Sequence, residues 1–107
     1  MDKITLKKEI KKVIAAFIED GKPLSFVGIS PVFEELVDTS YILKVYADWF
    51  DKIARYEALG IVIDKMYSVL SEDVRRYINR VELCDKGGDV HGETIDVILN
   101  EAGIEVG

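Results

Sequence analysis

Residues 40–70 read SYILKVYADWFDKIARYEALGIVIDKMYSVL. This stretch holds the only tryptophan and four of the five tyrosines, together with the longest apolar pattern of the chain. The spacing of its apolar residues changes near Phe50, from every second residue to every third or fourth. Such a change predicts a strand that is followed by a helix, so we expect both kinds of structure in this chain.

In the first part of the stretch every second residue is apolar. Its apolar positions are Tyr41, Leu43, Val45, Ala47 and Trp49. Aromatic and β-branched residues at every second position suit a half-buried strand, so we favour a strand from Tyr41 to Phe50. One long helix from Tyr41 is the alternative, because a polar stripe would then be formed by Lys44, Asp48, Asp51, Lys52 and Arg55.

The second part of the stretch has a helical pattern in both interpretations. Its apolar face would consist of Ile53, Tyr56, Ile63, Met66, Val69 and Leu70. The polar residues between them recur at helical spacing on the opposite side. The main helix is therefore expected to end near Leu70, before Ser71, which is a natural N-cap for a second, shorter helix.

Length and composition are those of one ordinary globular domain, residues 1–107. The chain is 49% hydrophobic and 32% charged, and none of its apolar runs approaches the roughly 20 residues of a membrane span. Its one cysteine, Cys84, excludes an internal disulfide and suits a reducing compartment. We therefore expect a cytoplasmic protein without a membrane segment and without a cofactor.

An amphipathic helix is expected over residues 3–20, before the stop signal Gly21-Lys22-Pro23. Its apolar face consists of Leu6, Ile10, Val13, Ile14, Phe17 and Ile18, and its opposite face carries Lys7, Lys8, Lys11 and Lys12. Four lysines neutralise too few phosphates for strong binding to nucleic acid, and the net charge of the chain is -6. Nucleic acid is therefore not an expected partner.

The remaining segments complete a predicted α+β domain of two layers. Residues 24–29 predict a short buried strand, in which Gly28 marks a bulge or a close backbone approach. This strand is expected to form a hairpin with the strand from Tyr41. Ser30-Pro31 either starts a short helix through Val37 or continues an edge strand. Residues 78–84 fit a helix or a strand, and we favour a third strand of a short antiparallel sheet. A last helix is expected over residues 93–103, and the alternative fold is an all-helical bundle.

One polar loop could bind a metal ion. Asp89, His91 and Glu93 alternate in GGDVHGE and would project from the same side of an extended segment. Two carboxylates and an imidazole are a plausible ligand set for a divalent metal, which would make the chain a small metal-dependent enzyme or metal-binding protein. The alternative is a solvated glycine-rich turn, in which Glu93 favours the start of the following helix.

The leading hypothesis is a non-catalytic module that binds another protein or itself. Residues 82–107 carry a net charge of -6, equal to that of the whole chain, and their acids include Asp96, Glu101 and Glu105. Tyr46 and Phe50 would lie on the second face of the sheet, where a helix, a ligand or a partner must cover them. An antitoxin-like or immunity-like role, in which the acidic quarter masks a basic partner, is one concrete version.

Overall fold

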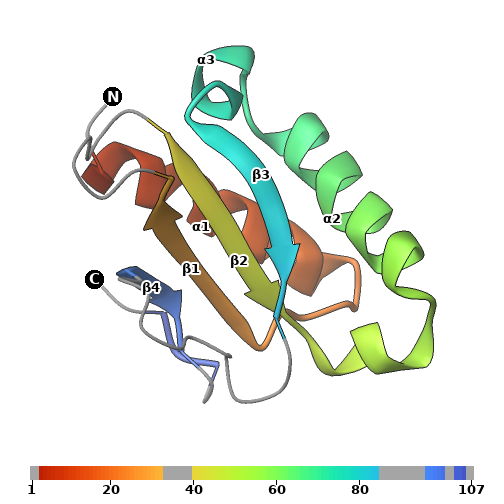
Figure 1. The fold of residues 1–107 in the computed structure, drawn as a ribbon. Coiled ribbons are helices and arrows are strands. Elements are labelled where there is room, and N and C mark those ends of the chain that lie inside the picture. The colour runs from red at the N-terminus through yellow and green to blue at the C-terminus, as the bar shows by residue number, and fades with distance from the viewer. Residues whose placement is uncertain (1–2, 33–39, 85–95, 101–102, 106–107) are drawn as a thin grey trace.

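The computed structural model describes residues 3–32, 40–84, 96–100 and 103–105. Its elements are, in order, α1 (Lys3–Glu19), β1 (Phe26–Pro31), β2 (Tyr41–Tyr46), the 3-10 helix η1 (Asp48–Lys52), α2 (Arg55–Val69), α3 (Glu72–Arg75), β3 (Ile78–Leu83) and β4 (Asp96–Leu99). The strands form one mixed sheet in the order β3-β2-β1-β4. Figure 1 shows α1 behind this sheet and α2 beside β3. The predicted α+β class is confirmed, with four strands instead of three.

The first helix forms where its amphipathic pattern predicts. Its buried side chains recur every three or four residues and are Leu6, Ile10, Val13, Ile14 and Phe17. Ile18, which the pattern also assigned to this face, is exposed. The helix ends because Gly21 adopts a φ of 73°, a left-handed conformation that glycine reaches without steric cost. The amide of Lys22 then donates to the carbonyl of Phe17 over 2.9 Å.

The predicted hairpin is confirmed. β1 and β2 pair antiparallel, from Phe26 opposite Tyr46 to Pro31 opposite Tyr41. β4 pairs with the other side of β1, and this register shifts between Val27 and Gly28, which agrees with the first of the two interpretations of Gly28, a bulge. Ser30 and Pro31 belong to the strand, so the helical interpretation is wrong at these two residues, and residues 33–37 lie outside the described part.

Pro31 is tolerated in this strand because its missing amide would not face β2. The amide of Val32 donates to the carbonyl of Ser40 over 3.0 Å, so residues 32, 30 and 28 direct their amides toward β2. The amide position of residue 31 is therefore on the β4 side. Among the described residues β4 pairs with β1 at residues 27–29, so no described residue loses a ladder hydrogen bond to the proline at position 31.

The central stretch turns earlier than its alternating pattern suggests. β2 ends at Tyr46, and residues 48–52 form η1 instead of continuing the strand to Phe50. The indole Nε1 of Trp49 donates to the carbonyl of Pro23 over 3.1 Å, and its ring packs edge-on against Phe50 at 4.6 Å. These contacts bury Phe50 by reversing the chain. The interpretation of one long helix from Tyr41 is wrong.

The third strand is confirmed, but its direction differs from the expected antiparallel one. Ser71 caps α3 as predicted, since its Oγ accepts from the amide of Val74 over 3.4 Å. β3 then runs parallel to β2, with Leu43 opposite Val81. The reason is that α2 and α3 carry the chain back along the sheet, and such a crossover joins parallel strands.

The predicted C-terminal helix is wrong at residues 96–99, which form the strand β4, while residues 93–95 and 101–102 lie outside the described part. Ile98 and Leu99 are buried and Val97 lies opposite Gly28, so the segment completes the open side of β1. Asn100 ends the strand by accepting the amide of Ile104 on its side-chain oxygen over 3.1 Å. Gly103, the last residue of the predicted helix, has a φ of 77° in the turn that follows.

Across the part of the chain that the structure describes, no helix is both long enough and apolar enough to cross a membrane.

Candidate functional site

The residues of the predicted metal site cannot be placed. Asp89, His91 and Glu93 all lie outside the described residues. Within residues 3–32, 40–84, 96–100 and 103–105, no three His, Cys, Asp or Glu side chains gather in a way that could hold a metal ion. The metal hypothesis therefore stays a prediction.

Tyr46 and Phe50, the predicted aromatic contacts, are buried within the chain. Tyr46 is 5% exposed and Phe50 is 8% exposed, and their rings meet edge to face at 6.1 Å. The Tyr46 hydroxyl donates to the carboxylate of Asp51 over 3.1 Å and lies 3.4 Å from that of Asp48. Burial and these two carboxylates raise the pKa of Tyr46 to about 12. Both side chains thus present little surface to a partner.

The predicted acidic contacts differ in their surroundings. Asp96 forms ion pairs with Lys7 at 2.7 Å and with Lys3 at 3.3 Å, so its charge is compensated by α1. Burial raises the pKa of the Asp96 carboxyl, but hydrogen bonds and charges from the two lysines outweigh it and lower this pKa. Glu105 is exposed opposite Leu99, and Glu101 lies outside the described residues.

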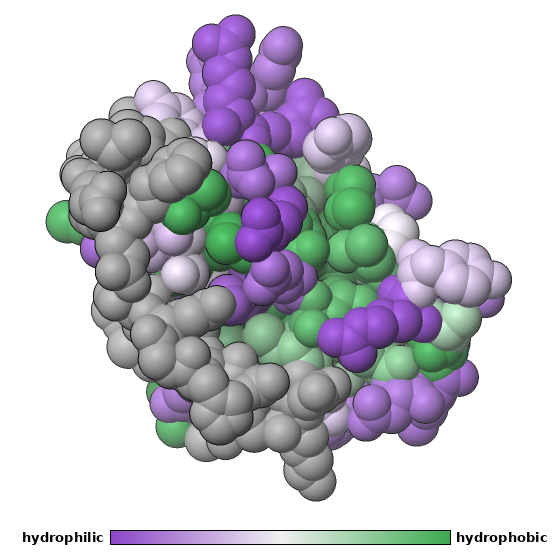
Figure 2. All heavy atoms as spheres, in the orientation of Figure 1, coloured by the Kyte–Doolittle hydropathy of each residue, from purple (hydrophilic) through white to green (hydrophobic). Residues whose placement is uncertain are grey.

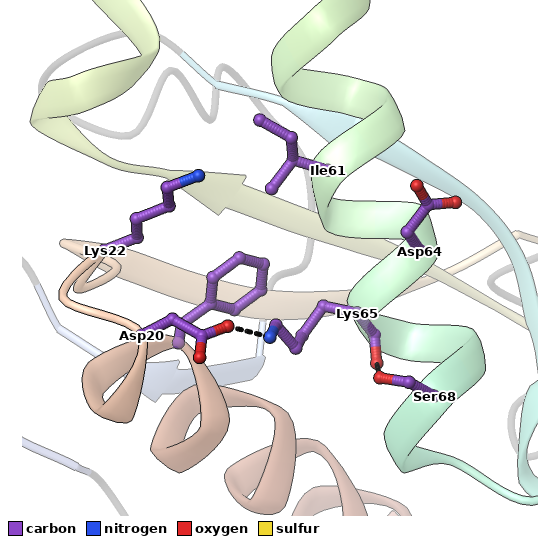
Figure 3. A pocket seen from close by; sticks show the side chains of 7 residues that line it. Asp20, Lys22, Ile61, Asp64, Lys65 and Ser68 are labelled. Carbon is purple, nitrogen blue, oxygen red and sulfur yellow. Dashed lines mark hydrogen bonds and ion pairs between the residues drawn. The ribbon is translucent and has the colours of Figure 1, made fainter.

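The first hollow on the surface lies between the end of α1 and α2, and Figure 3 shows it from close by. It has a volume of about 310 Å³ and is lined by Phe17, Asp20, Lys22, Ile61, Asp64, Lys65 and Ser68. Lys65 forms an ion pair with Asp20 across it, and Asp64 points away from this pair. The ammonium of Lys22 lies 5.9 Å from the Trp49 ring. Its lysines are thus already engaged, which makes it a weak candidate for a ligand site.

A second hollow, the α2–β3 groove, lies on the opposite flank of α2. It has a volume of about 140 Å³ and is lined by Ile63, Met66, Tyr67, Arg75, Ile78, Asn79, Arg80 and Val81. Figure 2 shows hydrophobic atoms at the surface between β3 and α2, bordered by hydrophilic ones. The groove therefore combines an apolar floor with a polar rim, as protein-binding surfaces do.

One wall of the groove is the edge strand β3. Among the described residues no strand pairs with its outer side. The amide of Cys84 donates to Val45, so alternate residues of β3 direct their backbone toward β2 and Val81 directs its backbone outward. Arg55 binds the carbonyl of Leu83 over 2.5 Å, which covers only one end of this edge. An outward-facing backbone beside an apolar groove can accept an extended peptide.

Two exposed tyrosines occupy the outer side of α2. Tyr56 is 76% exposed and Tyr67 is 62% exposed. They are 11 residues apart and hence lie on nearly the same side of the helix, about 16 Å apart along its axis. Only Tyr67 lines the groove, and the guanidinium of Arg75 lies over its ring at 4.5 Å. Tyr67 is thus an exposed aromatic residue whose ring is held in position by the guanidinium of Arg75.

A buried lysine lies on the face of the sheet that α1 does not cover. Lys44 is 4% exposed and pairs with Glu82 of β3 at 3.1 Å, and Arg80 binds the same carboxylate at 3.1 Å. Burial raises the pKa of the Glu82 carboxyl, but hydrogen bonds and charges from Lys44 and Arg80 outweigh it and lower this pKa. These ion pairs connect β2 with β3 and hold Arg80 at the rim of the groove.

No protein-family model, curated protein or solved structure matches the chain. Function is therefore inferred from the groove and from the edge of β3.

The sequence did not reveal the groove, although it contained one usable signal. Tyr67 was assigned to neither face of the main helix, whereas Tyr56 was assigned to the apolar face and is in fact exposed. The other lining residues belong to α2, α3 and β3, and only the crossover between β2 and β3 brings these elements together. A local pattern cannot report such a neighbourhood.

Proposed function

We propose that the chain is a non-catalytic protein-interaction domain that binds its partner in the α2–β3 groove and along the edge of β3. The observation that supports this most directly is the position of the groove, since an apolar hollow and an outward-facing strand backbone adjoin each other. An extended segment could add to β3 as a further strand and place alternate side chains in the groove.

The exposed Tyr67 supports the same proposal. Tyrosine supplies a large contact area with few rotatable bonds, and residues of this kind often contribute most to binding at interfaces. The guanidinium of Arg75 packs against the ring and restrains it, so Tyr67 loses less conformational freedom when a partner covers the ring. Tyr56 has no such support from the groove residues, which makes it the natural control.

An antitoxin-like or immunity-like role remains one concrete version of this proposal. In that version the domain masks a basic partner, and the net charge of -6 on residues 82–107 accelerates the association at low salt. Asp96 contributes less to this field than its sequence position suggests, because Lys3 and Lys7 compensate its charge.

The test compares Tyr67→Ala with Tyr56→Ala in a tagged pull-down from a lysate of the source cells. The wild-type chain and Tyr56→Ala should retain the same stoichiometric partner, whereas Tyr67→Ala should lose most of it. Both substitutions remove an exposed ring from the same helix, and urea unfolding of both variants measures any additional loss of stability that Tyr67→Ala suffers because its ring contacts Arg75.

Two results would contradict the proposal. Equal capture by the two variants would place the interface elsewhere. A wild-type chain that captures no protein and is monomeric by light scattering would contradict an interaction role altogether. Washing at low and then at high salt shows how much of the binding depends on charge, because screening weakens only the electrostatic part.

A further inference from the structure

We infer that the α2–β3 groove selects a segment with an acidic side chain, and that Arg75 is the residue that receives its carboxylate. This inference rests on the proposed function, since it names the chemistry of the segment that the groove binds. The occupant is an extended segment of another protein, in which an acidic residue is flanked by apolar ones.

The first support is the unused hydrogen-bonding capacity of Arg75. Its side chain lines the groove, its Nε is buried without a hydrogen-bond acceptor, and it forms no ion pair with any described residue. A guanidinium carries five N–H donors in a fixed plane and matches a carboxylate with two parallel hydrogen bonds. A ligand carboxylate would bind the terminal Nη donors, which have no acceptor among the described residues, whereas the Nε stays buried.

The second support is the orientation of this guanidinium. It is held by the ring of Tyr67, with 4.5 Å between the guanidinium carbon and the ring centroid. Stacking on an aromatic face fixes the plane of an arginine without consuming its N–H donors. Arg75 is therefore oriented before a ligand arrives, and the same ring lines the groove and is 62% exposed.

The other groove arginine is not available in the same way. Arg80 directs its Nε and Nη2 to Oε1 of Glu82, both at 3.1 Å, and the second oxygen of Glu82 binds Lys44. No carboxylate is among the residues that line the groove. The lining therefore carries one compensated and one uncompensated arginine, which favours an anionic group next to Arg75.

The floor of the groove determines what accompanies the carboxylate. It consists of Ile63, Met66, Ile78 and Val81, all of which are at least partly buried. Side chains of an added strand alternate between its two faces, so apolar residues at every second position could enter this floor. An acidic residue near one end of the segment would then reach Arg75.

The experiment selects random peptides displayed on phage against the immobilised full-length chain. Peptides that bind the wild-type chain should be enriched in Asp or Glu at one position among apolar residues. One enriched peptide is then synthesised with its acid and with the matching amide, and both are titrated by fluorescence anisotropy. The acid form should bind about tenfold more tightly, as expected for a charge-assisted pair of hydrogen bonds.

Variants of two arginines show which of them causes the preference for the acid peptide. Arg75→Gln should bind the acid and amide peptides equally, whereas Arg76→Gln, which changes an exposed neighbour that does not line the groove, should keep the preference. The comparison of two peptides on one protein cancels any general loss of stability in the variant.

Different results would contradict the role of Arg75 and the proposed interaction function. Peptides that bind through Tyr67 without a preference for an acid would overturn the role of Arg75 and leave the interaction function intact. A preference for the acid that survives in Arg75→Gln would also overturn it. The absence of any groove-dependent peptide would contradict both proposals, and a dimer that Tyr67→Ala converts to monomers would identify a second copy as the occupant.

Discussion

The carboxylate of Asp96 lies 2.7 Å from the Nζ of Lys7, so an ion pair ties the edge strand β4 to the first helix. Lys3 adds a second contact to the same carboxylate at 3.3 Å. Two segments that are far apart in the sequence are thereby joined at the open side of the sheet. Asp96, which the sequence suggested as a contact for a partner, thus forms its ion pairs within the domain.

Asp96→Asn should lower the free energy of unfolding by roughly 0.5 to 1 kcal/mol, because these ion pairs are partly exposed. The lowered pKa of Asp96 means that this stabilisation is present above the pKa of the unfolded chain, about 3.9, and is lost as the pH falls through the lower folded value. Urea unfolding at neutral and acidic pH measures both effects. Equal stability of wild type and Asp96→Asn at pH 7 would show that the ion pairs contribute nothing.

Glu82→Gln should destabilise the fold more than Lys44→Met does. The first change leaves the buried ammonium of Lys44 with weaker compensation, whereas the second removes the buried charge and leaves Glu82 paired with Arg80. We expect about 1 kcal/mol or more for Glu82→Gln and a smaller cost for Lys44→Met. Chemical denaturation of both variants tests this, and the reverse order would contradict it.

Two glycine substitutions should act in opposite directions. Gly21→Ala should destabilise the domain by roughly 1 to 2 kcal/mol, because residue 21 has a φ of 73°. Gly60→Ala should stabilise it by about 0.5 to 1 kcal/mol, because Gly60 lies inside α2 and a Cβ there meets nothing within 4 Å. Thermal unfolding followed by circular dichroism gives both signs, and destabilisation by Gly60→Ala would contradict the packing around α2.

Tyr46→Phe should change how stability depends on alkaline pH. The folded chain holds the phenolic proton more tightly than the unfolded chain, since the pKa of Tyr46 rises from 10.0 to about 12. The resulting stabilisation is complete below the unfolded pKa and is lost as the pH rises through the folded value. The wild type should therefore lose more stability than Tyr46→Phe over this range. Tyr56→Phe serves as the exposed control, and parallel pH curves for wild type and Tyr46→Phe would contradict the prediction.

Local patterns in the sequence were sufficient for much of the fold. The buried stripe of α1, the stop at Gly21, the bulge at Gly28 and the cap at Ser71 all occur where the sequence predicts them. Each of these features depends on the chemistry of one residue or on a spacing within one element. Such information is present in the chain before any long-range contact forms.

The wrong predictions of secondary structure occur where contacts with a distant segment decide the local structure. Residues 96–99 have helical spacing, but the unpaired side of β1 offers hydrogen bonds and a place to bury Ile98, so they become a strand. Phe50 continues the alternation of β2, yet the contacts of Trp49 with Pro23 and Phe50 turn the chain first. Tertiary context overrides a local preference in both cases.

By itself, the sequence determined the α+β class, the first helix and the hairpin, because their apolar residues repeat with the period of one element. Only the tertiary structure decided the parallel direction of β3, the pairing of β4 and the position of the α2–β3 groove. These features depend on which segments meet after the crossover through α2 and α3. Hydrogen bonds between strands and burial between elements are long-range interactions, so no local spacing encodes them.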